Sequence, residues 1–119
     1  MAMFNSFLPS IGIHVKWVDM HDIAAIEQAI DDKTRCVFCE VLGNTPHLTV
    51  VDVSGVKKVT EKHGIPCVVD ATCTAGLLKP FAAGADIVIY SLTKWYGGHG
   101  NVLAGAILAR PDFHWFSKR

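Results

Sequence analysis

Two short runs of mostly apolar residues constrain the fold of this chain most strongly. Residues 66–70 and 85–91 are mostly apolar, with valine and isoleucine at their centres and no regular alternation of polar and apolar side chains. Continuous apolar strands of this kind are typical of a parallel sheet whose two faces are both covered by helices. The chain is therefore expected to form an α/β fold.

Strand and helix patterns alternate along the rest of the chain. Three further strands are predicted from apolar and β-branched content, at residues 13–18, 34–40 and 102–108. One helix is expected after Asp22 and a second between Asp52 and Gly64, since aspartate caps helix starts and glycine ends helices. Residues 76–83 are expected to form a turn or a short helix. Together these patterns predict one α/β unit with a largely parallel sheet flanked by helices.

The composition is apolar and its opposite charges balance. Of the 119 residues, 50% are hydrophobic and 18% are charged, so part of the apolar surface is expected to pack against a neighbour. The formal net charge is zero and no basic stripe is present, which argues against nucleic acids and anionic membranes as partners. No membrane-spanning run or basic leader is present, and a cytoplasmic location is the default expectation.

Charged and hydroxyl side chains follow the two apolar strands. Asp70 ends the first strand, while Ser91, Thr93 and Lys94 follow the second, directly before the glycine-rich residues 97–100. A lysine amine forms a Schiff base with an aldehyde, hydroxyls bind phosphate, and a carboxylate pairs with a protonated pyridine nitrogen. Pyridoxal phosphate carries all three groups. Ligands of α/β sheets bind at the carboxyl ends of strands, so the sequence predicts a pyridoxal-phosphate site there.

Each of these residues also has a simpler interpretation. A lysine after a strand is often a solvent-exposed surface residue. An aspartate in the same position often caps the next turn by accepting backbone N–H groups. The combination of Asp70, the Ser-x-Thr-Lys run and the glycines favours the cofactor. A nucleotide loop is not favoured, because Lys94 precedes the glycines where a phosphate-binding loop lysine follows them.

The four cysteines do not predict a metal site. Cys36 and Cys39 have the spacing of a metal-binding pair, but they fall in a predicted strand, where residues three apart point to opposite faces. We expect four reduced, mostly buried thiols, of which only Cys73 lies near the predicted cofactor. His99 is left open between a contact with the cofactor region and a hydrogen bond to the backbone.

Several separated segments resemble the pyridoxal-phosphate enzymes of cysteine and methionine metabolism, the transsulfuration family. The segments include Glu40 to Asn44, Asp70-Ala71-Thr72, Thr74-Ala75-Gly76 and Thr93-Lys94-Trp95. The resemblance runs from about Phe4 to Trp115 and, within the family, is greatest to the O-acetylhomoserine sulfhydrylases. It implies that residues 1–119 form part of the large, cofactor-binding domain of fold type I, without the upstream phosphate loop and the C-terminal domain.

The resemblance also implies roles for individual residues. Lys94 corresponds to the lysine that bonds to the cofactor, Asp70 to the partner of the pyridine nitrogen, and Ser91 and Thr93 to the phosphate ligands. Asn44 corresponds to an asparagine near the cofactor and the substrate carboxylate, and Thr72 to a threonine beside the ring. Two departures from the family pattern, Ala71 in place of asparagine and Thr45 before Pro46, bear on efficiency rather than on the identity of the cofactor.

The implied activity is replacement of the acetyl group of O-acetylhomoserine by sulfide, which gives homocysteine. The implied substrate is thus a small amino acid, and the full-length enzyme is implied to be a homo-oligomer, a tetramer. A cystathionine or methionine γ-lyase is the alternative within the family. A non-catalytic remnant or subunit-interaction fragment is the alternative outside it.

Overall fold

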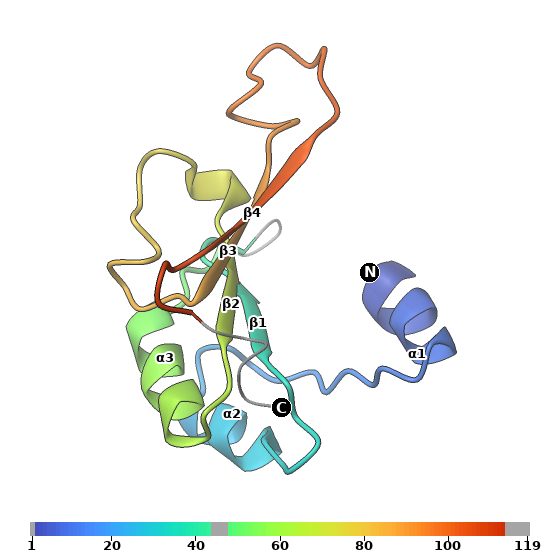
Figure 1. Ribbon diagram of the computed structural model, residues 1–119, viewed down its shortest axis with the longest axis vertical. Coiled ribbons are helices and arrows are strands. Elements are labelled where there is room, and N and C mark those ends of the chain that lie inside the picture. Colours follow the sequence, from blue (N-terminus) through green and yellow to red (C-terminus); the bar gives the residue numbers. More distant parts are fainter. Residues whose placement is uncertain (1, 44–47, 114–119) are drawn as a thin grey trace.

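The computed structural model describes residues 2–43 and 48–113, which contain a four-stranded sheet (Figure 1). In order across the sheet, the strands are β1 (Val37–Glu40), β2 (Cys67–Asp70), β3 (Ile87–Ser91) and β4 (Gly105–Ala109). The first three strands run parallel, whereas β4 pairs antiparallel with β3. The predicted α/β fold with a largely parallel sheet is therefore confirmed.

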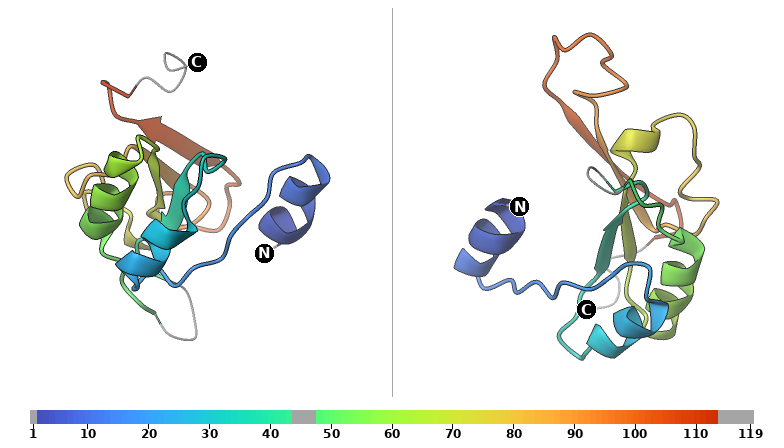
Figure 2. Two further views of the ribbon diagram at one scale, coloured as in Figure 1. Left: turned by 90° about the horizontal axis from the view of Figure 1, so that it is seen from below. Right: turned by 180° about the vertical axis from the view of Figure 1, so that it is seen from behind.

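Two helices, α2 (Ile23–Ala29) and α3 (Val53–Lys62), lie together on one side of the sheet (Figure 2). Both predicted helix caps are confirmed, since the carboxylates of Asp22 and Asp52 accept backbone N–H groups from the first turns at 2.9 and 3.0 Å. The second helix ends just before Gly64, as the sequence indicated. None of the described helices is long and apolar enough to cross a membrane.

The core lies between these helices and the sheet. Alternate strand residues point toward the helices, and the core includes Val37, Cys39, Cys67, Val69 and Val88 from the strands and Ile26, Val53, Val56 and Val59 from the helices. On the opposite face Ile87 and Ile89 are only half-buried, and Phe38 contacts the ring of Phe4 at a centroid distance of 5.3 Å. Within the described chain, α2 and α3 therefore cover only one of the two faces for which the apolar runs predicted helices.

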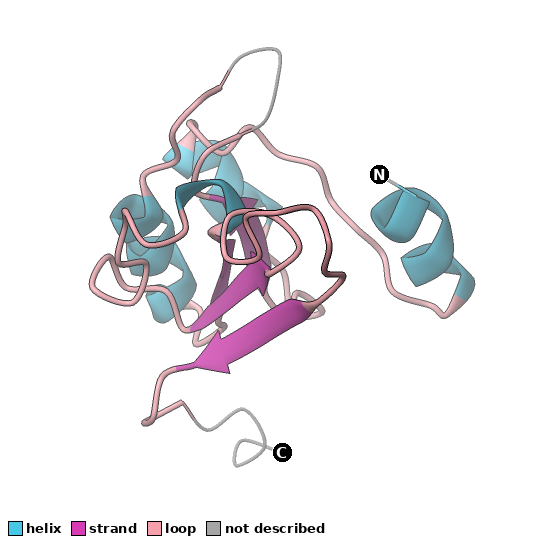
Figure 3. Cartoon of the chain, turned by 90° about the horizontal axis from the view of Figure 1, so that it is seen from above, coloured by secondary structure: helices cyan, strands magenta, loops and turns pink. Residues whose placement is uncertain are grey.

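The N-terminal part of the chain lies to one side of the sheet and contacts it through the rings of Phe4 and Phe38. A short helical stretch, η1 (Met3–Phe7) and α1 (Leu8–Ser10), is joined to α2 by a long irregular segment (Figures 1 and 3). The prediction of a strand at residues 13–18 is wrong, because no described strand lies beside this segment to complete a hydrogen-bond ladder. Residues 76–83 form turns, in agreement with the sequence.

A buried carboxylate joins several elements at the N-terminal edge of the sheet. Asp86, which precedes β3, is 2% exposed, and both its oxygens lie 3.0 Å from Nζ of Lys57 on α3. Oδ2 also accepts the backbone N–H of Cys67 at 2.9 Å, and Oδ1 lies 3.4 Å from Nη2 of Arg110. Gly84 has a φ of +103° and leaves room for the Lys57 side chain, since a Cβ there would come within 2.8 Å of Lys57 Cγ.

Replacing Asp86 by asparagine is expected to destabilise the fold by about 3–5 kcal/mol, because the amide leaves the largely buried Lys57 cation without a carboxylate. The matched control is Asp31→Asn, which weakens the exposed ion pair between Lys16 and Asp31 and should have little effect. Urea unfolding of both variants measures the difference. Equal losses of stability in the two variants would contradict the expected role of Asp86.

Candidate cofactor-binding site

Three strands end together at the carboxyl edge of the sheet, and the predicted cofactor residues lie there. Asp70 is the last residue of β2 and Ser91 the last residue of β3, its parallel neighbour. Glu40, the last residue of β1, is paired with Asp70 in the register. Lys94 follows shortly after the end of β3. The arrangement brings the carboxylate of Asp70 and the Ser-x-Thr-Lys run to one edge, as parallel strands require.

The turn after β2 orients the carboxylate of Asp70. Its Oδ1 accepts the backbone N–H of Thr72 at 2.8 Å, and the side chain is half-buried. Its Oδ2 makes no hydrogen bond with any residue in the described ranges. The turn-cap interpretation therefore accounts for one oxygen, and the second oxygen is available to a protonated ring nitrogen.

The two hydroxyls of the Ser-x-Thr-Lys run differ in what they bind. Thr93 Oγ1 donates to the carbonyl of Ala104 at 3.2 Å and accepts the N–H of the same residue at 3.0 Å. Because a hydroxyl carries one proton, that of Thr93 is used within the loop. The Ser91 hydroxyl has no hydrogen bond to the part of the chain that the structure describes. Ser91 is thus the better placed of the two to donate to a phosphate.

Lys94 begins a tight loop. Its backbone N–H donates to the carbonyl of Ser91 at 3.2 Å, and its own carbonyl accepts the N–H of Gly98 at 2.8 Å. The side chain is exposed, and its ammonium group forms no ion pair with residues 2–43 or 48–113. An amine without partners can bond to an aldehyde, although the surface-residue interpretation fits the same exposure.

Close packing holds the loop that contains Lys94. A Cβ at Gly97 would clash with the side chain of Val102, so only glycine fits there. The ring of Tyr96 packs edge-on against Tyr90 of β3 with centroids 5.3 Å apart, and burial together with this neighbour raises the pKa of Tyr90. Nδ1 of His99 lies 2.9 Å from the carbonyl of Gly97, which favours the backbone contact of its two interpretations.

Asn44 lies outside the described residues, and its predicted role is not tested. The expectation of mostly buried thiols is wrong for Cys36 and Cys73, which are exposed, because each lies outside the sheet in a connecting segment. Cys39 and Cys67 are buried within the sheet, and hydrogen bonding and burial beside Cys39 raise the pKa of Cys67.

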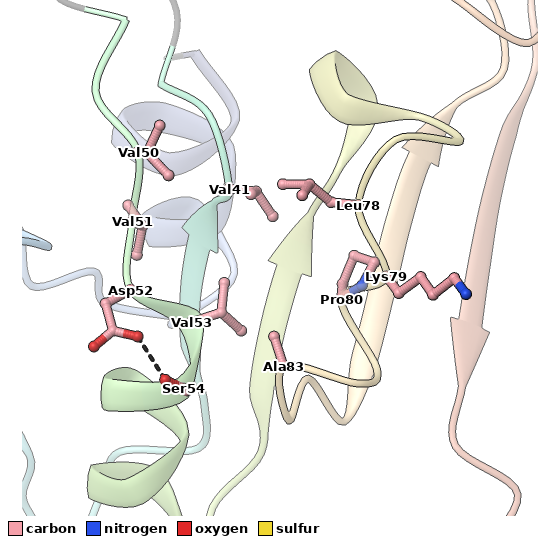
Figure 4. A pocket seen from close by; sticks show the side chains of 10 residues that line it. All are labelled: Val41, Val50, Val51, Asp52, Val53, Ser54, Leu78, Lys79, Pro80 and Ala83. Carbon is pink, nitrogen blue, oxygen red and sulfur yellow. Dashed lines mark hydrogen bonds between the residues drawn. The ribbon is translucent and has the colours of Figure 1, made fainter.

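A cavity of about 230 Å³ lies beside the start of α3 and was not anticipated from the sequence (Figure 4). It is lined by Val41, residues 50–54, residues 78–80 and Ala83. Its side chains are mostly apolar, the ammonium of Lys79 points away from it, and Ser54 donates to Asp52 at 2.7 Å. None of the predicted cofactor residues lines this cavity, and it lacks the convergent polar groups that a reaction requires.

The architecture matches solved structures of pyridoxal-phosphate enzymes. The chain superimposes with a TM-score of 0.88 and 33% identity on a putative O-acetylhomoserine (thiol)-lyase from Campylobacter jejuni, whose structure contains N'-pyridoxyl-lysine-5'-monophosphate. The match covers 93% of this chain and 27% of that one. The fold is thus part of the large domain of a fold type I pyridoxal-phosphate enzyme, as predicted.

Residues 1–118 match the family described as Cys/Met metabolism PLP-dependent enzyme, and the chain belongs to this family. It is 43% identical over 108 residues to the O-acetyl-L-homoserine sulfhydrylase of Leptospira meyeri, covering 90% of this chain and 24% of the relative. It is 42% identical over 113 residues to the sulfhydrylase FUB7 of Fusarium oxysporum f. sp. lycopersici, and the match covers 93% of this chain and 26% of that relative. The chain therefore spans about a quarter of the length of these curated relatives.

We expect pyridoxal phosphate, added to the protein and fixed with borohydride, to label Lys94. Peptide mass mapping identifies the labelled lysine, and the variant Lys94→Arg should lose the label because arginine does not form a Schiff base. Lys57 is held by Asp86 and should remain unlabelled. A label found mainly on exposed Lys79 would show that Lys94 is an ordinary surface residue.

Proposed function

We propose that this chain supplies part of the cofactor-binding domain of an enzyme that converts O-acetylhomoserine and sulfide into homocysteine and acetate. The observation that carries the proposal is the arrangement at the carboxyl edge of the sheet, where Oδ2 of Asp70, the Ser91 hydroxyl and the Lys94 amine have no partner among residues 2–43 and 48–113. The identity to sulfhydrylases of Leptospira and Fusarium supports this reaction over others of the family.

The three groups suit different parts of one cofactor. Pyridoxal phosphate supplies an electron sink that stabilises negative charge at the Cα of an amino acid. Asp70 Oδ2 would hold the proton on the ring nitrogen, and the Ser91 hydroxyl would donate to a phosphate oxygen. Lys94 would hold the aldehyde end covalently. Once the substrate amine has displaced it, the Lys94 amine would move protons at the substrate Cα and Cβ.

Three further residues complete the proposed contacts. Thr72 follows Asp70 in the turn and is half-buried at the same edge, consistent with a place beside the ring. Thr93 could donate to the phosphate only after its hydroxyl leaves Ala104. Asn44 is proposed from the family resemblance alone.

The remaining parts of the site are proposed to lie outside these residues. By the family resemblance, these parts are the upstream phosphate loop, an aromatic residue that stacks on the ring, and the C-terminal domain with an arginine that binds the substrate carboxylate. A small amino-acid substrate is consistent with the family. A tetrameric enzyme and a cytoplasmic location remain predictions from the sequence, and so does the γ-lyase alternative.

The 119-residue chain with added pyridoxal phosphate is expected to show little or no sulfhydrylase activity, because positioning of the substrate alone supplies about 7–11 kcal/mol of barrier lowering in enzymes. Homocysteine formation from O-acetylhomoserine and sulfide measures it. An enzyme that contains these residues in full length should form homocysteine. Ammonia release from methionine at a comparable rate would support the lyase, and a folded chain without the absorbance of lysine-bound cofactor would support the remnant.

Asp70→Asn in the full-length enzyme should keep the fold and lower kcat/KM by about a hundredfold or more, because the amide preserves shape but removes the charge that holds the ring proton. Glu61→Gln, which removes an exposed carboxylate on α3, is the control and should leave the activity unchanged. Steady-state kinetics and a pH titration of the cofactor absorbance are measured for both variants. Unchanged turnover in Asp70→Asn would show that the Asp70 carboxylate only caps the turn.

A further inference from the structure

Thr72 connects the two strand ends that carry the candidate site. Its backbone N–H donates to Oδ1 of Asp70 at 2.8 Å, and its side-chain Oγ1 accepts the backbone N–H of Ser91 at 2.8 Å. Both distances are those of good N–H···O hydrogen bonds, and both bonds are partly shielded from water. One residue thus links a functional side chain of β2 to the backbone that ends β3.

The hydroxyl of Thr72 takes the place of a backbone acceptor. Past the end of β2, the N–H of Ala71 still donates to the carbonyl of Ile89 at 3.0 Å. A regular parallel ladder would continue with the N–H of Ser91 donating to the carbonyl of Ala71. That carbonyl instead accepts the N–H and hydroxyl of Thr74 at 3.1 and 3.3 Å, because the chain turns into η2 (Thr72–Thr74). Thr72 Oγ1 therefore satisfies an N–H that the turn would otherwise leave unpaired.

We infer that Thr72 is a positioning residue that sets the spacing between the Asp70 carboxylate and Ser91 at the end of β3. The inference rests on the proposed function, in which a rigid cofactor is held by groups on both strands. Its ring nitrogen would meet β2 and its phosphate would meet β3, so a variable spacing between the strand ends would weaken binding. This role requires the oxygen of Thr72 and differs from a contact between its methyl group and the ring.

Hydrogen exchange at the Ser91 amide, measured by NMR without cofactor, tests whether the Thr72 hydroxyl protects the Ser91 N–H. Thr72→Val removes the acceptor and should raise the exchange rate of Ser91 about tenfold, as expected for loss of one hydrogen bond. Thr72→Ser keeps the oxygen and should keep the protection. Thr74→Val is the matched control, because it removes a hydroxyl from the same turn that contacts neither Asp70 nor Ser91.

Titration with pyridoxal phosphate and with pyridoxal tests whether Thr72 positions the two strand ends for the cofactor. Pyridoxal lacks the phosphate and would not engage Ser91, the residue whose amide the Thr72 hydroxyl holds. Thr72→Val should therefore weaken pyridoxal phosphate binding about tenfold and pyridoxal binding much less, within about threefold. Thr72→Ser and Thr74→Val should bind both compounds like the unchanged protein.

The outcomes separate the inference from the proposed function. Unchanged Ser91 exchange in Thr72→Val, or equal weakening for both compounds, would overturn the positioning role while the proposed function stands. If the unchanged chain binds neither compound, the proposed function fails and the positioning role fails with it. If Thr72→Val does not fold, Thr72→Cys carries the same expectations, because a thiol is a weak acceptor of similar size.

Discussion

The buried carboxylate of Asp86 is the interaction on which the arrangement of the sheet depends. A charge with 2% exposure is tolerated only when other groups replace its water, and those groups come from several elements. Lys57 reaches it from α3, the N–H of Cys67 comes from the start of β2, and Arg110 follows β4. Satisfying this one carboxylate therefore fixes where the helix and three strands meet, and an apolar core alone would define that meeting point less sharply.

Polar groups at the two edges of the sheet differ in whether they have protein partners. At the N-terminal edge, protein groups satisfy the charge of Asp86. At the carboxyl edge, Oδ2 of Asp70, the hydroxyl of Ser91 and the amine of Lys94 have no partners within the described residues. The same strands, β2 and β3, run through both edges, so the ladder that is anchored at one end holds these unpaired groups at the other. Polar groups held in this way by rigid elements are prepared to bind a ligand.

Sequence features that depend only on residues close together in the chain predicted the structure well. The caps at Asp22 and Asp52 depend on N–H groups within the next turn, and both formed as expected. The strand predicted at residues 13–18 depends on a neighbouring strand, which periodicity cannot supply, and it did not form. Cys73 was misjudged for a related reason, since its burial depends on what packs over the turn after β2 rather than on its residue type.

The sequence by itself determined the α/β class and the residues of the candidate site, because the apolar runs and the Ser-x-Thr-Lys segment that follows one of them are contiguous in the chain. Only the tertiary structure decided which side chains and backbone groups, distant in the chain, contact each other. Lys57 and Asp86 are 29 residues apart, and the Thr72 hydroxyl meets an N–H 19 residues away at Ser91. Such contacts depend on which strands pair and in what register, and residue spacing along the chain does not specify either.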